Sequence, residues 1–313
     1  MYKIGTFYRD VFEYFEENVK TEFEARQIRY VYMSRKELVI DQDMDMLITG
    51  TLSDEELKFF PKLSAVFVPY TGLDGLNIPA LKQRNIQVYN TSAHGFFVAE
   101  RALALTLAVM GKIVASHNGM VKGSWHNRTV MELLYWSSLK GKKVAIFGYG
   151  TIGQHFHDMV KPFQVEVGIV KYKNRTYKDT LTFKDLHTLA DWCDVLVITA
   201  PLTDNTKSAI DSDIFEVLKG SVLINIARGP IIDEEALYTA LESGELKGFG
   251  SDVWFNYPTK ETPICEPSNY DLSQFDQVVM TPHNGGFEEN SRKVRYDDVI
   301  ETIYSIINKN GLD

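Results

Sequence analysis

Three glycines spaced as G-x-G-x-x-G mark the segment that most constrains the fold of this chain. They are Gly148, Gly150 and Gly153. The apolar run at residues 142–147 predicts a buried strand, and residues 154–161 predict a helix that ends at a proline. The first glycine permits a tight turn, the second lets a ligand approach the backbone, and the third lets helix and strand lie close. Strand, glycine turn and helix in this order predict a Rossmann-type unit that binds the pyrophosphate of a dinucleotide at the helix N-terminus.

The length and charge of the chain limit the kinds of protein it can be. Its 313 residues suffice for two domains, each with its own hydrophobic core. The net charge of −9 argues against nucleic acid or an anionic membrane as the main partner. No apolar run reaches the ~18 residues of a membrane span, and the N-terminus resembles a strand and a polar turn rather than a signal peptide. We expect a cytoplasmic protein without a metal site, and its two cysteines, Cys193 and Cys265, fit a reducing compartment.

Short apolar runs alternate with helix-like segments along both halves of the chain. This rhythm predicts parallel sheets with helices on both faces, so the expected fold class is α/β with two doubly wound domains. The helix expected at residues 98–121 is apolar nearly all round in its first half and should be buried, for example against another subunit. The predicted strands are 3–7, 30–33, 45–49, 65–68, 86–90, 142–147, 165–170, 195–200, 221–227, 248–254 and 278–281. The predicted helices are 11–18, one from residue 53, 78–84, 98–121, 154–161, 183–191, 212–218, 233–243 and 287–308.

Further motifs follow one another in a specific order and together carry a resemblance to a known family. The motifs are residues 70–74, 98–101, 123–125, 148–153, 200–206, 225–229, 251–254 and 281–286. With them, the chain resembles the D-isomer-specific 2-hydroxyacid dehydrogenases over essentially its whole length. The resemblance implies a flavodoxin-like substrate domain formed by residues 1–97 and 286–313, and a nucleotide domain formed by residues 98–285. It also implies an active site in the cleft between the domains, and a homodimer.

The same resemblance assigns catalytic and substrate-binding roles. Arg228 is expected to bind the substrate carboxylate and polarise its C2 oxygen, and His283 to act as the general acid when a 2-oxo acid is reduced. The residue types fit, because a guanidinium offers a planar fork to a carboxylate and an imidazole exchanges a proton near neutral pH. The backbone N–H groups of Tyr70, Thr71 and Gly72 are expected to hold the carboxylate from the opposite domain.

Other residues are expected near the cofactor or the substrate. His94 either lines the substrate site or satisfies a neighbouring carbonyl, and Asn225 is expected to order its loop. Aromatic residues near the cleft indicate an apolar or aromatic pocket: Tyr70, Phe96 and Phe97, with Tyr135 or Trp136 from the arm at residues 122–140. The expected cofactor-binding residues are Gly148, Gly150, Thr151, Ile152, Gly153, Pro201, Thr206, Ala227 and Asp252, the last beside the nicotinamide carboxamide.

Tyr257 departs from the family pattern. Family members usually have a glutamate there, which holds the catalytic histidine and favours its protonated form, and a neutral phenol cannot supply that charge. In a first interpretation, which we favour, Tyr257 hydrogen-bonds His283 and the enzyme reduces best at mildly acidic pH. In a second, Glu261 or Glu266 replaces the missing carboxylate. In a third, the reaction needs no proton transfer, as in formate dehydrogenases.

The end of the second strand of the nucleotide domain indicates which cofactor is preferred. NAD enzymes place an acidic residue there to bind the ribose hydroxyls. In this chain the position is near Lys171, and Lys173 and Arg175 follow, with no carboxylate before Asp179. Three cations suit a 2′-phosphate, so NADP is favoured over NAD; the alternative is a solvated basic loop.

Two classes of function remain open at this point. The leading hypothesis is an NADPH-linked oxidoreductase that reduces a small 2-oxo acid such as glyoxylate or hydroxypyruvate to a D-2-hydroxy acid. The alternative is a cofactor-sensing protein like the transcriptional corepressors of the same fold. The presence of both Arg228 and His283 favours catalysis.

Overall fold

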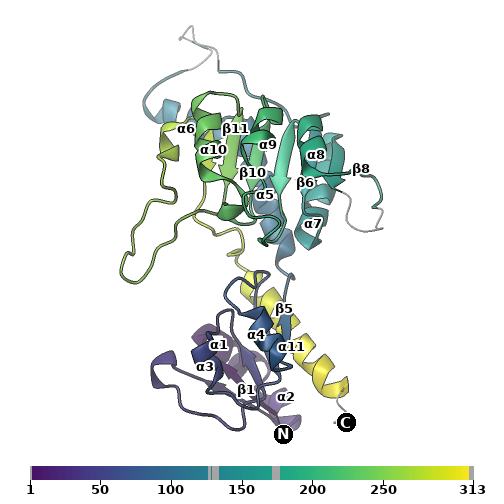
Figure 1. Cartoon of the computed structure of the whole chain (residues 1–313), viewed down its shortest axis with the longest axis vertical. Coiled ribbons are helices and arrows are strands. Elements are labelled where there is room, and N and C mark those ends of the chain that lie inside the picture. Colours follow the sequence, from purple (N-terminus) through teal and green to yellow (C-terminus); the bar gives the residue numbers. More distant parts are fainter. Residues whose placement is uncertain (1, 126–127, 129–133, 171–176, 310–313) are drawn as a thin grey trace. The chain divides into compact units, whose positions relative to one another are not determined.

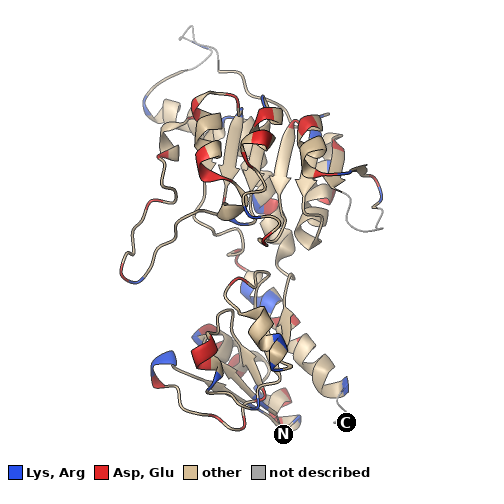
Figure 2. Cartoon of the chain, in the orientation of Figure 1, with Lys and Arg blue, Asp and Glu red and all other residues tan. Residues whose placement is uncertain are grey.

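The computed structural model describes residues 2–125, 128, 134–170 and 177–309, and they form two compact α/β units (Figure 1). Unit 1 consists of Met1–His94 and Glu289–Asp313, and unit 2 of Gly95–Glu288. The longer helices in the described ranges do not combine the length and hydrophobicity needed to cross a membrane. Acidic and basic side chains are interspersed over both units (Figure 2).

Unit 1 contains a parallel sheet in the order β2-β1-β3-β4-β5. This is the flavodoxin-like order, in which the direction of winding reverses beside the first strand. The strands are β1 (Tyr2–Thr6), β2 (Ile28–Tyr32), β3 (Met46–Ile48), β4 (Ala65–Val68) and β5 (Gln87–Asn90). The helices are α1 (Arg9–Asn18), α2 (Lys20–Ala25), α3 (Asp54–Leu57), α4 (Ile78–Gln83) and α11 (Ser291–Lys309), with a 3-10 turn at Arg35–Glu37.

Each face of this sheet has its own apolar core. On one face, Ile4, Met46 and Phe67 pack with Phe15 of α1, Phe23 of α2 and the apolar stripe of α11. That stripe repeats at helical spacing and consists of Tyr296, Val299, Ile300, Ile303 and Ile307. On the other face, Leu47 and Val66 pack with Leu57 and Leu81 of α3 and α4. The C-terminal helix therefore completes a sheet formed by the first part of the chain.

Unit 2 contains a parallel sheet in the order β12-β11-β10-β9-β6-β7-β8. This is the Rossmann order with one added strand, and the direction of winding reverses between β6 and β9. The strands are β6 (Lys143–Phe147), β7 (Glu166–Val170), β8 (Leu181–Phe183), β9 (Val195–Ile198), β10 (Val222–Asn225), β11 (Gly248–Ser251) and β12 (Val278–Met280). The helices are α5 (Gly95–Met110), α6 (Ile113–Val121), α7 (Thr151–Val160), α8 (Leu186–Trp192), α9 (Ser212–Val217) and α10 (Glu234–Glu242). Three 3-10 turns are Lys161–Phe163, Gly229–Ile231 and Leu272–Gln274.

Helices cover both faces of the second sheet. Residues of α5 and α7, including Leu105 and Phe156, form one core with Val144, Ile146 and Val197. Residues of α8, α9 and α10 form the other core, on the opposite face. The predicted fold class, two doubly wound parallel α/β units, is confirmed.

Some predicted elements were wrong in detail. The single helix expected at residues 98–121 breaks at Lys112, whose φ of +50° is left-handed, and it continues as α6 with no buried residue. Gly111 precedes this break, as is common where helices end. Phe183 belongs to β8 rather than to the following helix, which begins after its cap Asp185. The last helix begins at Ser291 rather than at residue 287. Both α2 and β8 were missed.

Candidate functional site

The glycine turn is held in a conformation that only glycine adopts without strain at its first position. Gly148 has φ +100°, and a methyl group there would lie 2.3 Å from the backbone nitrogen of Ala200. A methyl group at Gly153 would lie 2.5 Å from the carbonyl oxygen of Gly148, so the helix could not approach as closely. No described atom lies within 4 Å of the corresponding position at Gly150, so the turn is open there.

The turn leads directly into α7, whose N-cap residue is Gly150 and therefore has no side chain to cap the helix. In contrast, Asp185, Asp211 and Asp233 cap the helices α8, α9 and α10. Uncapped N–H groups and the positive end of the helix dipole attract an anion. The open backbone at Gly150 and the start of α7 behind it fit the pyrophosphate of a dinucleotide.

A second loop, after β9, lies at the same edge of the sheet as the glycine turn. It follows β9, beside β6, where the direction of winding reverses and where nucleotides bind in such sheets. Thr206 organises this loop, because its hydroxyl donates to the Pro201 carbonyl at 2.7 Å and accepts from the Thr203 N–H at 2.8 Å. Thr151 is exposed and Ile152 half-buried at the start of α7. The cations Lys171, Lys173 and Arg175 lie outside the described residues.

Arg228 follows β10 at this carboxyl edge and is half-buried. Asn225 organises its loop as expected: its amide donates to the Arg228 carbonyl at 2.9 Å, and its side-chain oxygen accepts from the Ala227 N–H at 3.0 Å. The Arg228 guanidinium donates to the Ala227 carbonyl at 2.6 Å. The backbone around the arginine is thus fixed by buried and partly buried hydrogen bonds at the edge of the sheet.

His283 follows β12 at the same edge and has φ +55°. Asp252, after β11, fixes the loop around it and is only 3% exposed. Its carboxylate accepts from the Thr281 hydroxyl at 2.6 Å and from the backbone N–H groups of Asn284 at 3.1 Å and Gly285 at 2.7 Å. Asp252 therefore holds Thr281 on one side of Pro282-His283, and Asn284 and Gly285 on the other. The sequence did not reveal this role.

Arg228 and Asp252 both lie close enough to His283 to act on its pKa. Partial desolvation lowers the pKa of His283 most, the positive charge of Arg228 lowers it further, and Asp252 acts in the opposite direction. Unit 2 therefore brings together the guanidinium and the imidazole that the sequence singled out, although they are far apart in the chain.

Tyr257 is next to His283, but not in the expected way. Their ring centroids are 5.4 Å apart at an angle of 57°, and the Tyr257 hydroxyl accepts from the Trp254 N–H at 3.1 Å. Among the described residues, the contact between Tyr257 and His283 is one between rings, and the expected hydrogen bond from the Tyr257 hydroxyl to His283 is not formed. Glu261 and Glu266 are exposed, and the charges that act on the His283 pKa are those of Arg228 and Asp252. The replacement by either glutamate is therefore not supported.

In unit 1, the loop after β4 contains Tyr70, Thr71 and Gly72. The Thr71 carbonyl accepts from the Asn90 amide at 2.7 Å, and the Thr71 hydroxyl donates to the Thr91 carbonyl at 3.3 Å. The Arg295 guanidinium of α11 reaches the carbonyl of Pro69, just before this loop, at 3.4 Å. Contacts from two distant parts of the chain therefore hold the loop.

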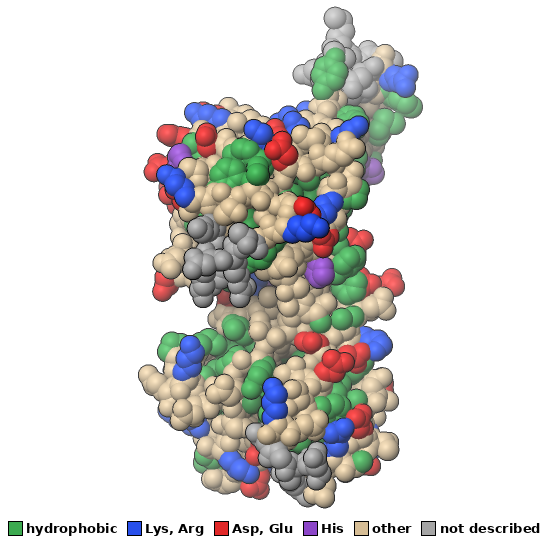
Figure 3. All heavy atoms as spheres, turned by 90° about the vertical axis from the view of Figure 1, so that its right-hand side faces the viewer, with side chains coloured by type: hydrophobic (Ala, Val, Ile, Leu, Met, Phe, Trp, Pro, Cys, Tyr) green, Lys and Arg blue, Asp and Glu red, His purple; other side chains and the backbone are tan. Residues whose placement is uncertain are grey.

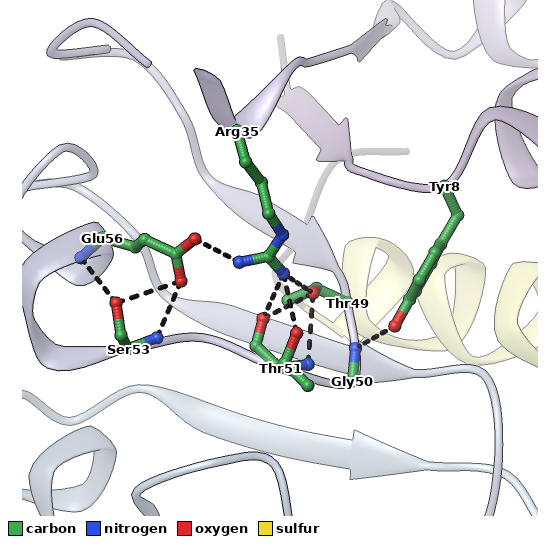
Figure 4. Close-up of polar contacts among 7 residues, drawn as sticks. All are labelled: Tyr8, Arg35, Thr49, Gly50, Thr51, Ser53 and Glu56. Carbon is green, nitrogen blue, oxygen red and sulfur yellow. Dashed lines mark hydrogen bonds and ion pairs between the residues drawn. The ribbon is translucent and has the colours of Figure 1, made fainter. Parts of the chain in front are cut away.

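The loop after β3 lies against Tyr70. A methyl group at Gly50 would lie 1.4 Å from the Tyr70 hydroxyl. That hydroxyl is 3.3 Å from the Tyr8 hydroxyl, which accepts from the Gly50 N–H at 2.9 Å. On the far side of the loop, Arg35 donates to Thr51, at 2.7 Å to its carbonyl, and pairs with Glu56 (Figure 4). Neither Tyr8 nor Arg35 was expected from the sequence, because both come from other strand ends.

His94, at the end of unit 1, is 6% exposed, and its Nδ1 has no hydrogen-bond partner among the described residues. Burial and then the charge of Arg295 lower its pKa to about 4. It is therefore neutral at pH 7. Of the expected pocket aromatics, Phe96, Tyr135 and Trp136 are exposed, by 49%, 71% and 66%.

Comparisons with known proteins place the chain in a family. Residues 103–285 match the family model of the D-isomer specific 2-hydroxyacid dehydrogenase, NAD binding domain. The chain is 32% identical over 260 residues to a glyoxylate reductase of Thermofilum pendens, over 80% of this chain and 75% of that protein.

Solved structures resemble the structure of this chain over nearly its whole length. An NADPH-dependent glyoxylate/hydroxypyruvate reductase of Sinorhizobium meliloti, in complex with NADP and malonate, matches with TM-score 0.80 and 25% identity, over 97% of this chain and 93% of that one. An NAD-dependent formate dehydrogenase of Staphylococcus aureus, in complex with NAD, matches with TM-score 0.77 and 25% identity, over 99% and 96%. The chain therefore belongs to the D-isomer-specific 2-hydroxyacid dehydrogenases, NAD(P)-dependent oxidoreductases that transfer a hydride between the nicotinamide cofactor and a 2-oxo or 2-hydroxy acid.

Proposed function

We propose that this protein reduces a small 2-oxo acid, such as glyoxylate or hydroxypyruvate, to the D-2-hydroxy acid, with NADPH preferred over NADH. The observation that carries the proposal is the grouping of Arg228, Asp252 and His283 after three strands of one sheet, with Arg228 lowering the His283 pKa. The glycine turn follows a fourth strand of that sheet. Because parallel strands share their carboxyl edge, cofactor-binding and proton-transferring groups lie on the same side of unit 2.

The residues have separate tasks in the proposed reaction. Arg228 binds the substrate carboxylate through its planar fork and polarises the C2 oxygen. The N–H groups of Tyr70, Thr71 and Gly72 also bind the carboxylate. His283 in its protonated form gives its proton to the C2 oxygen as the alkoxide develops. When bound, the reduced nicotinamide supplies the hydride. Asp252 holds the loop around His283, so the proton is delivered from a fixed position.

The lowered pKa of His283 predicts how the rate of the proposed reduction depends on pH. Desolvation and the charge of Arg228 both disfavour the imidazolium. Reduction needs that imidazolium, so its rate should fall as pH rises through a value below the usual histidine pKa of ~6.5. The oxidation of the hydroxy acid needs the neutral ring and should be favoured above that value.

Steady-state kinetics test the proposal. A panel of 2-oxo acids, including glyoxylate and hydroxypyruvate, is assayed with NADPH and with NADH, and formate oxidation is assayed with both oxidised cofactors. We expect turnover of at least one 2-oxo acid, with a lower KM for NADPH. Equal or lower KM values for NADH contradict the cofactor preference, formate oxidation alone favours reaction without proton transfer, and absence of any turnover favours a sensing protein.

We also propose that the protein is a cytoplasmic homodimer. Both cysteines are free, and burial raises the pKa of the Cys193 thiol to about 12, as befits an unreactive core residue. Apolar side chains (green) gather at the upper right of Figure 3, and exposed apolar side chains occur on α6 and on the described part of the arm that follows. They are Ile113 at 59%, Val121 at 73%, Trp125 at 55%, Tyr135 at 71% and Trp136 at 66%. Such clusters usually mark a protein–protein interface.

Light scattering tests the oligomeric state. The wild type should have the mass of two chains, and Val121→Glu should reduce it to one. Val39→Glu is the matched control, because Val39 is 75% exposed but belongs to unit 1. A monomeric wild type, or dissociation by both variants alike, contradicts the assignment of this surface.

A further inference from the structure

Tyr149 lies between the first two glycines of the cofactor turn, and its side chain is half-buried. Its hydroxyl forms a hydrogen bond with Nδ1 of His157 on α7. His157 is only 3% exposed. The Tyr149 ring also meets the edge of Tyr177, with ring centroids 4.7 Å apart, and the His157 ring at 5.8 Å. The Tyr149 side chain thus connects the turn to a buried residue of the helix that follows it.

Both partners of this hydrogen bond are neutral at pH 7. Burial lowers the pKa of His157, and the nearby charge of Lys161 adds to that effect. Burial raises the pKa of Tyr149 to about 12. In a hydrogen bond between a neutral phenol and a neutral imidazole, one group donates and the other accepts. A buried polar atom left without such a partner destabilises the folded state.

The other contacts of the turn show how the Tyr149–His157 hydrogen bond contributes to its conformation. The Thr199 hydroxyl donates to the Gly148 carbonyl, which anchors the beginning of the turn to the residue after β9. Gly150 has no described atom near the position of a side chain. The Gln154 amide donates to the Tyr149 carbonyl at 3.4 Å. Tyr149 itself supplies the buried side-chain anchor for the middle of the turn, next to the backbone that the pyrophosphate must approach.

We propose that His157 is a positioning residue for cofactor binding: it holds Tyr149, and Tyr149 holds the glycine turn in the conformation that receives the pyrophosphate. Neither residue touches the reacting atoms in the roles assigned above. The pair acts on cofactor affinity, whatever the identity of the 2-oxo acid. A failure of this inference is thus distinguishable from a failure of the proposed substrate.

Fluorescence titration with NADPH tests the inference on the full-length protein. Tyr149→Phe keeps the ring and removes the hydroxyl, and it should weaken NADPH binding by about tenfold, the upper part of the range for one buried hydrogen bond. His157→Leu should have the same effect, and His157→Asn, which can place a polar atom near the position of Nδ1, should restore part of the affinity. The double variant Tyr149→Phe/His157→Leu should bind no more weakly than His157→Leu alone, because both changes break one interaction.

Two further measurements separate positioning from general loss of structure. The kcat at saturating NADPH should stay within about twofold of wild type, because one hydrogen bond in the turn does not alter proton transfer. His155→Leu is the matched control, since His155 is also on α7 but its ring meets Phe96 instead, and NADPH affinity should be unchanged. If His157→Leu does not fold, Tyr149→Phe and His157→Asn decide the question. NADPH affinity within twofold of wild type in Tyr149→Phe, or additive losses in the double variant, overturns the inference.

Discussion

Placing a carboxylate at position 257 should raise the pKa of His283 and extend reduction to higher pH. In the wild type, the Tyr257 ring is tilted against the imidazole with centroids 5.4 Å apart. Its hydroxyl accepts from the Trp254 N–H and carries no charge. The charges that act on the His283 pKa are Arg228, which lowers it, and Asp252, which raises it. Tyr257→Glu adds a second negative charge to this balance.

The separation of the two rings sets the size of the effect. A unit charge at 5.4 Å from the imidazolium stabilises it by about 3 kcal/mol at an effective dielectric constant of ~20, and by about 0.8 kcal/mol at ~80. These limits correspond to roughly half a unit to two units of pKa. Tyr257 is 43% exposed, so solvent screens the new charge and the lower half of the range applies. We expect a rise of about one pKa unit.

The assay is the pH dependence of kcat/KM for NADPH-dependent reduction of the 2-oxo acid that turns over best. The wild-type rate should decline at a pH below the ordinary histidine range, and in Tyr257→Glu the decline should move up by about one pH unit. Tyr257→Gln is the control, because it removes the ring without adding charge and should leave the midpoint where it was. If Tyr257→Glu and Tyr257→Gln have the same midpoint, His283 does not respond to charge at this position and the electrostatic reasoning is refuted.

Three other substitutions test separate parts of the structure. Burial and then Arg295 lower the His94 pKa to about 4, so the unfolded chain binds a proton that the folded state excludes. The folded state therefore loses stability as the pH falls from ~6.5 to 4. Urea unfolding at pH 7 and at pH 4.5 should show that His94→Leu removes up to about 3 kcal/mol of this loss. Asp252→Ala releases the loop around the catalytic histidine and should lower kcat by about a hundredfold at saturating cofactor; an unchanged kcat argues against the anchoring role. In Gly229→Ala the new methyl group would lie 2.2 Å from the Trp254 carbonyl oxygen, which should destabilise the fold by about 1–3 kcal/mol, measured as the shift in the urea midpoint.

The sequence predicted the fold well where local signals and long-range packing agree. The strands of both sheets are short apolar runs, and the glycine turn fixes which of them begins the nucleotide unit. It failed at β8, whose residues Leu181–Phe183 have no buried member and pair only at the edge of the sheet. It also failed at Lys112, because the residues on both sides of the break have helical patterns and only the left-handed backbone separates them.

The site was predicted less completely, because its supporting contacts come from distant segments. Arg228 and His283 follow strand ends and were singled out by motif, so their place at one edge of the sheet follows from the topology. The contact of Arg295 with Pro69 joins residues 226 positions apart, and nothing local to α11 marks that arginine. The Tyr8–Gly50 hydrogen bond joins two strand ends that become neighbours only when the sheet has formed. Side-chain partners of this kind depend on the packed structure rather than on any local pattern.

The missing glutamate can be reconciled with acid catalysis through Arg228. In the free protein the guanidinium charge opposes protonation of His283. When Arg228 binds a substrate carboxylate, that anion neutralises the guanidinium and adds a negative charge near the imidazole, so the His283 pKa rises on binding. The pH profile of kcat/KM reports the free enzyme and that of kcat reports the complex. The decline of kcat should therefore lie at higher pH than the decline of kcat/KM, whereas coincident profiles would mean that the substrate carboxylate does not act on His283.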